Sequence, residues 1–170
     1  MALTYIPIAT VKVGSGGAAS IEFTSIPQTY TDLVVKLSAR FNASTIGVAT
    51  TFNNSTTNYS RRTVGQYQGS VSSSSTITTS IRTDLMVAYL DATANTFGSG
   101  ELYIPNYAGS NYKSLSADGV AESNNTEYGV NLIAGLWSDA SAITSIKLAN
   151  SDGNNFVQHS SATLYGISKG

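Results

Sequence analysis

Apolar and polar residues alternate with a period of two along several stretches of this sequence. In the segment 32–40 (DLVVKLSAR), Leu33, Val35 and Leu37 fall on one side, whereas Lys36 falls on the other. Successive side chains of an extended chain point to opposite faces, so such a segment buries one face and exposes the other. On this pattern we expect the following side chains to point into a core: Ile21, Phe23, Leu33, Val35, Leu37, Leu148 and Leu164.

Other stretches complete an all-β pattern. The segments 82–90 and 128–137 are more continuously apolar than the alternating segments, as strands that are covered on both faces tend to be. Gly-rich and Asp-Gly turn signals at 14–17 and 151–155 indicate hairpin turns. No window of eleven residues sustains the helical i, i+3, i+4, i+7 spacing without Gly or a run of β-branched residues. We therefore predict a single domain over residues 1–170, an antiparallel β-sandwich of about ten strands, with a jelly roll as the expected form.

The segment 53–80 departs from this pattern. It is rich in serine and threonine, has few apolar residues and shows no clean alternation, so we expect a long polar loop there. Tyr59, Arg62 and Tyr67 give the loop side chains that are suited to contact with a partner. A mobile, serine-rich loop without a partner is the alternative interpretation.

The charge composition excludes several classes of function. Charged residues make up 11% of the chain, whereas about 25% of the residues of a typical globular protein are charged. The net charge of the chain is -1. Phosphate binding needs clustered Lys and Arg, so we expect no nucleic-acid partner. No apolar stretch approaches the ~20 residues of a membrane span, so we expect no membrane association. The N-terminal residues do not form a signal-peptide pattern, so we expect the protein to be synthesised in a cytoplasm.

The residues that enzymes use are scarce. The chain has one histidine, His159, and no cysteine, so a catalytic triad, a zinc site or another bound cofactor is not expected. Asp118 and Glu122, with Glu101, are the carboxylates that a glycoside hydrolase would use. The same residues fit the exposed face of a sheet, so we expect no catalytic residue. A hydrolase of cell-surface polysaccharide is the minor alternative.

Several phrases of the sequence, taken together, point to a known group of proteins. The elements are Ile-Pro-x-x-Tyr-x-Asp-Leu at 26–33, Phe-Asn at 52–53 before Asn58 and Tyr59, Ile-Pro-x-Tyr at 104–107, Trp137 followed by Ala-Ile-Thr-Ser-Ile at 142–146, and the closing Leu-Tyr-Gly-Ile. In this order they resemble small bacteriophage virion proteins, many of them from phages of aquatic bacteria. The resemblance extends from about Phe23 to Ile167.

The resemblance implies a non-enzymatic β-sandwich that works in many copies. Its first implication is a capsid decoration (cement) protein on the virion surface, made in the bacterial host cytoplasm, with the major capsid protein as its partner. The alternative is a tail, fibre or head-displayed module that recognises host glycan. For that alternative Trp137 with Asp139 would provide the sugar platform if the ring faced outward, although its apolar neighbours favour burial.

The last strand of the sequence suggests how copies associate. The segment 161–167 (SATLYGI) offers apolar groups to both faces, so we expect an interior strand beside an early strand, with both termini at one end. We expect Tyr165 and Ile167 to be covered by a neighbouring copy in a homotrimer.

Overall fold

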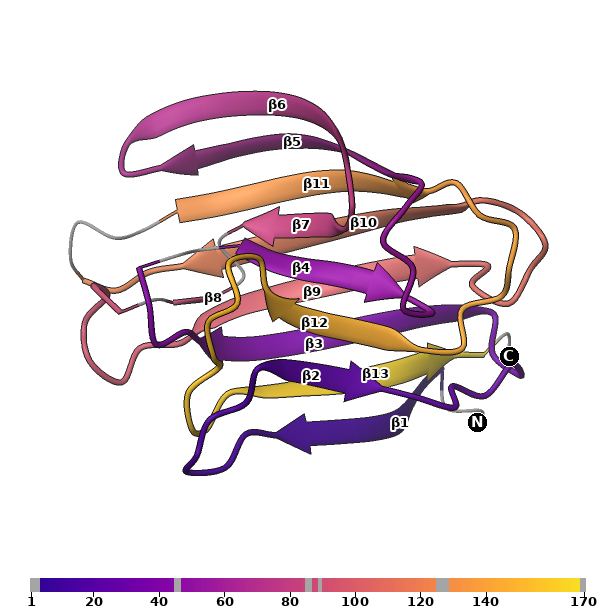
Figure 1. Cartoon of the computed structure of the whole chain (residues 1–170), viewed down its shortest axis with the longest axis horizontal. Coiled ribbons are helices and arrows are strands. Elements are labelled where there is room, and N and C mark those ends of the chain that lie inside the picture. The colour runs from indigo at the N-terminus through magenta and orange to yellow at the C-terminus, as the bar shows by residue number, and fades with distance from the viewer. Residues whose placement is uncertain (1–3, 45–46, 85–86, 89, 125–128, 169–170) are drawn as a thin grey trace.

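The computed structural model describes residues 4–44, 47–84, 87–88, 90–124 and 129–168, and their regular structure is entirely β (Figure 1). There are 13 strands in the described ranges. Their bounds are β1 Tyr5–Lys12, β2 Ser20–Phe23, β3 Asp32–Arg40, β4 Gly47–Phe52, β5 Tyr59–Tyr67, β6 Ser70–Thr78, β7 Ile81–Asp84, β8 Val87–Ala88, β9 Gly98–Pro105, β10 Lys113–Ala121, β11 Gly129–Trp137, β12 Ile146–Asn150 and β13 Ser161–Ile167.

The strands form two sheets that pack face to face. The large, 9-stranded sheet has the order β1-β13-β3-β9-β10-β11-β5-β6, with β8 beside β3, and the small, 4-stranded sheet has the order β2-β12-β4-β7. Figure 1 shows the small sheet lying over the middle of the large one, with β5 and β6 beyond it. The predicted antiparallel β-sandwich is confirmed, and it contains more strands than the ten expected.

The connections follow the predicted jelly roll. The strands β1 to β4 alternate between the sheets, and the block β1-β13-β3-β9 faces β2-β12-β4-β7, which is the arrangement of two interlocked Greek keys. Two hairpins, β5–β6 and β10–β11, are inserted into this scheme and widen the large sheet. The turns at 14–17 and 151–155 are present, but each joins strands of different sheets rather than the two arms of a hairpin.

The core lies between the sheets, where the alternating pattern placed it. All seven side chains predicted to point inward belong to the buried hydrophobic cluster, and Lys36 is exposed between two of them. A one-residue slip of register would have exchanged the buried and exposed sets. The alternation therefore determines which face of each of these strands is covered.

The prediction of a long polar loop over 53–80 is wrong. Residues 59–78 form the β5–β6 hairpin, whose first strand pairs along its whole length with β11. Gln68 and Gly69 make a two-residue turn with φ values of 49° and 82°, the left-handed conformation that suits the twist of a hairpin. The apolar alternation is missing because β6 is exposed on both faces and has no side to bury.

The predicted place of the last strand inside the sheet is confirmed. β13 lies between β1 and β3 and pairs with both. Tyr5 is opposite Ile167, and the amide of Ser168 donates to the carbonyl of Thr4 at 3.2 Å, so both ends of the described chain meet at one edge (Figure 1).

Candidate binding face

The surface that carries unusual side chains is the outer face, defined as the face of the large sheet turned away from the small sheet. Side chains along β11 alternate between the two faces of the sheet, and Val130 and Leu132 lie on the outer face. The sequence predicted that β11 would be covered on both sides, but these side chains remain exposed. An antiparallel sheet with one open face usually has polar residues there, so apolar residues on it require an explanation.

Four such side chains form what we call the apolar patch: Val64, Val120, Val130 and Leu132. They are between 46% and 57% exposed. Val120 is directly opposite Val130, and Leu132 is directly opposite Val64, so the four lie on the adjacent strands β10, β11 and β5. Directly opposite side chains in antiparallel strands are close enough to touch. The apolar patch is therefore one continuous surface.

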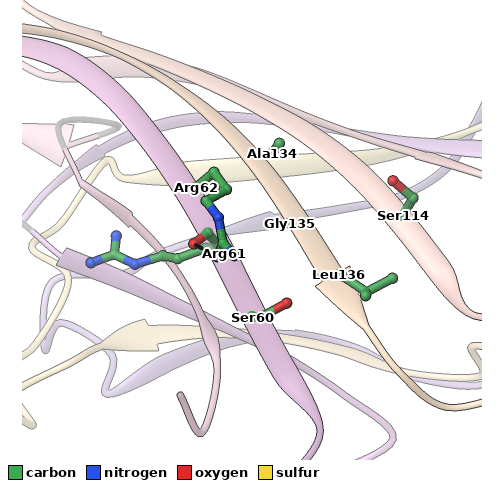
Figure 2. A pocket seen from close by; sticks show the side chains of 7 residues that line it. All are labelled: Ser60, Arg61, Arg62, Ser114, Ala134, Gly135 and Leu136. Carbon is green, nitrogen blue, oxygen red and sulfur yellow. Dashed lines mark hydrogen bonds between the residues drawn. The ribbon is translucent and has the colours of Figure 1, made fainter. Parts of the chain in front are cut away.

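Two shallow depressions lie beside the apolar patch. The first has a volume of about 280 Å³, and its lining includes Ser60, Arg62, Ser114 and Leu136. Figure 2 shows Arg61, from the same strand, directed away from Leu136 and Ser114, and its Nη1 donates to the carbonyl of Arg82 at 2.7 Å. The second depression, about 230 Å³, shares Arg62 and Ala134 with the first. Arg62, a predicted contact residue, thus lies between the two.

Three tyrosines form a second region of the outer face, which we call the tyrosine patch: Tyr5, Tyr103 and Tyr165. The rings of Tyr5 and Tyr165 meet edge to face, with centroids 6.1 Å apart and planes at 69°, a favourable geometry for aromatic pairs. Val34 is directly opposite both Tyr165 and Tyr103, and it is 0% exposed. The tyrosines thus cover an apolar side chain that alternation alone would place in solvent.

Charged groups border the tyrosine patch. The hydroxyl of Tyr103 donates to Oδ2 of Asp32 at 2.9 Å, and this bond to a carboxylate raises the pKa of Tyr103. Lys36 pairs with Glu101 across β3 and β9, and the hydrogen bond to that carboxylate raises the pKa of Lys36. Exposed aromatic rings beside ionised groups and hydrogen-bond acceptors suit a polar ligand with an apolar side.

The predicted contact residues do not form one site. Tyr165 and Ile167 are half-buried on β13, Arg62 is exposed on β5, and Tyr67 is half-buried at the end of β5. Five strand spacings, about 24 Å, separate β13 from β5 in the sheet order.

The prediction that Tyr59, the fifth of these residues, contacts a partner is wrong, because Tyr59 belongs to the core. It is 1% exposed, its hydroxyl accepts a hydrogen bond from the amide of Phe52 at 2.8 Å, and burial raises its pKa to about 12.

Trp137 does not form the sugar platform considered from the sequence. Its ring is 1% exposed and stacks on Tyr59, with centroids 6.1 Å apart and planes at 17°. Asp139 accepts a hydrogen bond from the amide of Ser141 at 2.7 Å, which lowers the pKa of Asp139. The condition for this glycan site, an outward-facing Trp137, is not met.

The motifs that carry the family resemblance have structural roles here. The hydroxyl of Tyr107 donates to the carbonyl of Pro27, which joins the Ile-Pro-x-Tyr element to the Ile-Pro entry. Asn53 donates from Nδ2 to the carbonyl of Ala142 at 2.8 Å and accepts from the amide of Thr144 at 2.8 Å. These two contacts therefore hold loops at one end of the sandwich, whereas Asp32 and Tyr165, which also belong to the motifs, lie at the tyrosine patch of the outer face.

Of the three carboxylates weighed for catalysis, Asp118 and Glu101 are neighbours, and Glu122 lies beyond the end of β10. Asp118 is exposed on the outer face opposite Glu101, which is paired with Lys36, and Glu122 accepts a hydrogen bond from the amide of Asn124 at 2.7 Å. Over the described ranges, no group of three or more His, Cys, Asp or Glu side chains is placed to hold a metal ion. That part of the chain also has no helix long and apolar enough to cross a membrane.

The sequence contained a signal for the apolar patch that the analysis of alternating residues did not identify. The segment 128–137 carries apolar residues on both faces. Such a strand is either covered on both faces or leaves an apolar surface exposed, and which of the two occurs depends on how far the second sheet extends.

Comparison of the chain with family models, with curated proteins and with solved structures finds no match.

Proposed function

We propose that this protein is a non-enzymatic structural protein of a bacteriophage virion, a decoration protein that coats the head and binds the major capsid protein. The observation that carries the proposal is the apolar patch on the outer face. It supplies a broad, flat contact surface, and the adjoining depressions, at about 280 and 230 Å³, are smaller than most small-molecule pockets, which span ~300–1,000 Å³. A protein-sized partner fits such a surface better than a small ligand.

The energetics are compatible with a contact of this kind. Burying a Val or Leu side chain fully contributes ~1.5–3 kcal/mol, and about half of that is still available for each half-exposed residue. Arg62 at the edge of the patch adds a hydrogen-bonding group of the type that is enriched in protein interfaces. The resemblance to virion proteins supplies the class of partner.

The test is rebinding to virions from which this gene has been deleted. Wild-type protein is expected to coat the particles at regular positions visible by electron cryomicroscopy. Leu132→Asp and Val64→Asp should weaken binding tenfold or more without unfolding, because both side chains are half-exposed. The matched control is Thr24→Asp, an exposed residue beside β2 of the small sheet. Equal binding by all variants, or no binding by the wild type, would refute the proposal.

The tyrosine patch favours a second candidate function, recognition of host cell-surface glycan. Tyr5 and Tyr103 present ring surface next to Asp32, and aromatic rings with neighbouring acceptors suit the mixed apolar and polar faces of a sugar. Titration calorimetry with host polysaccharide should show binding that Tyr5→Ala abolishes and Leu132→Asp retains. The reverse pattern would contradict it.

In the decoration proposal, neighbouring copies cover Tyr165 and Ile167 in a homotrimer. Both side chains are half-buried on the outer face, so part of their surface remains for a partner. The double variant Tyr165→Ala/Ile167→Ser should sediment as smaller species than the wild type. Identical sedimentation of the two proteins would remove the trimer from the proposal.

A further inference from the structure

The strand β6 is an open edge of the large sheet. It pairs with β5 on one side, ends the strand order, and lies beyond the small sheet (Figure 1). All but one of its residues are exposed. An unpaired strand presents a row of free N–H and C=O groups, which is a template for another strand.

The other edge strands of the two sheets carry devices that hinder such pairing. β1, at the opposite edge, contains Pro7, a bulge after it and Lys12. In the small sheet, β2 and β7 have only 4 residues each, and they contain Glu22 and Arg82. Proline, bulges, charge and short length all protect edges.

β6 has none of these protections. It is 9 residues long, its sequence SVSSSSTIT holds no charge and no proline, and it pairs with β5 in regular register without a bulge. From this contrast we propose that β6 is a self-association edge, where two copies of the chain pair antiparallel about a twofold axis at Ser74. The proposal does not depend on the proposed function.

The position of the axis follows from the two apolar residues of the strand. Val71 and Ile77 are 79% and 88% exposed and lie on the same face, three positions to either side of Ser74. Antiparallel pairing about Ser74 sets Val71 of each copy directly opposite Ile77 of the other. Directly opposite apolar pairs stabilise a sheet, and the other residues of β6 would form Ser and Thr pairs.

The charges nearby do not oppose this pairing. A twofold contact places each residue near its own counterpart, so a charged strand would repel itself, and β6 is uncharged. The nearest cations, Arg61 and Arg62, are on β5. Two copies of Arg62 would be at least three strand spacings apart, about 14 Å, which exceeds the screening length of about 10 Å at 0.1 M salt.

The size of the contact predicts its strength. One strand from each partner buries less than the ~1,600 Å² of a standard stable interface. The dimer should therefore be weak in dilute solution and favoured where copies are concentrated. Pairing of this kind joins the large sheets of two copies, so both outer faces lie on the same side of the dimer.

The lack of cysteine in the described chain allows a direct test. Directly opposite residues in antiparallel strands have Cα atoms ~4.5–5.5 Å apart, within the range of a disulfide. Under a thiol–disulfide redox buffer, Ser74→Cys should form crosslinked dimers. Ser72→Cys is the matched control: its own counterpart would be four residues away along the strand, so crosslinking should be at least tenfold less. Because crosslinking reports contact at one position, trimers formed through Tyr165 do not affect it.

Charge exchange on the Ser74→Cys background tests the register. Val71→Lys with Ile77→Lys should abolish crosslinking, whereas Val71→Lys with Ile77→Glu should retain it by setting opposite charges face to face. Leu132→Lys, two strands away from the edge, should leave crosslinking unchanged. Equal crosslinking at positions 72 and 74, or undiminished crosslinking with both lysines, would overturn the proposal. So would no crosslinking by Ser74→Cys at several hundred micromolar protein.

Discussion

Val34 lies directly opposite Tyr165 in the pairing of β3 with β13, and it is completely covered although it points to the outer face. Tyr103 flanks it from β9 on the other side. A small apolar core therefore exists on the face of the sheet that has no second sheet above it. Tyrosine side chains flank it on both neighbouring strands, so its contribution to stability can be measured separately from that of the main core.

We expect Val34→Ala to destabilise the fold like a core substitution, by about 2 kcal/mol, because two buried carbon groups are removed and a cavity remains. Val64→Ala, on the same face but half-exposed, is the control and should cost less than about 0.5 kcal/mol. Urea unfolding followed by circular dichroism measures both changes. Equal effects would mean that the tyrosines do not exclude water from Val34.

Tyr59 should make the fold sensitive to alkali. Its pKa is raised from 10.0 to about 12 by burial, so the unfolded chain loses this proton first as the pH rises. The stability contributed by the neutral phenol is complete below pH 10 and declines as the pH rises to about 12. Unfolding in urea at a series of pH values should show this fall.

Tyr59→Phe separates the charge from the hydrogen bond. At pH 7 it should cost about 1–3 kcal/mol, because the amide of Phe52 loses its acceptor. The remaining stability should then fall less steeply above pH 10. Tyr112→Phe, at an exposed tyrosine, should behave as the wild type. A Tyr59→Phe variant with the wild-type slope above pH 10 would show that other groups cause the alkaline loss.

Arg40 should hold the loop 90–96 closed. Its guanidinium donates to the carbonyls of Leu90, Ala92, Thr93 and Thr96 at 2.9–3.1 Å. Arg40→Lys keeps the charge but has no planar fork to reach four carbonyls. We expect amide exchange at Leu90 to accelerate about tenfold or more, while amides in β10 and β11 keep their rates. Unchanged exchange at Leu90 would contradict this role.

Gly166 should not tolerate a side chain. A Cβ atom there would lie 2.3 Å from the ring of Tyr30, whereas a Cβ atom at Gly14 would meet nothing within 4 Å. Gly166→Ala should therefore destabilise the fold by about 1–3 kcal/mol, and Gly14→Ala should be neutral within about 0.5 kcal/mol. Thermal unfolding compares the two, and adding Tyr30→Leu to Gly166→Ala should recover part of the loss.

Alternation predicted the sandwich because its strands each bury one face, as Val35 and Lys36 illustrate on adjacent positions of β3. It failed for β6, since a strand that is exposed on both faces has no apolar side to reveal it. The turn at Gln68 and Gly69 was the remaining local signal, and a Gln-Gly pair is a weaker hairpin signal than Asn-Gly.

The binding face was less predictable than the fold. Which apolar residues of β11 stay exposed depends on where the small sheet ends, and that is a long-range property. Arg62 was identified as a contact residue because its side chain suits contact with a partner and it stands in a serine-rich segment with few apolar residues, and it lies between the two depressions. Tyr59 was identified on the same grounds, but its ring packs in the core with Trp137. Residue type alone did not separate these two cases.

The place of β13 in the sheet also determines when the protein can fold during synthesis. β1 and β3 are made early, yet they are not neighbours, because residues 161–167 lie between them. A ribosome must therefore produce nearly the whole described chain before β1 can pair with β13, whereas β3 can already pair with β9. Pairing between residues so distant in sequence is slow and leaves strand edges open meanwhile. We therefore expect the sandwich to stay incomplete until β13 has been made, and the nascent chain to rely on holding chaperones or on its hydroxyl-rich sequence to remain soluble until then.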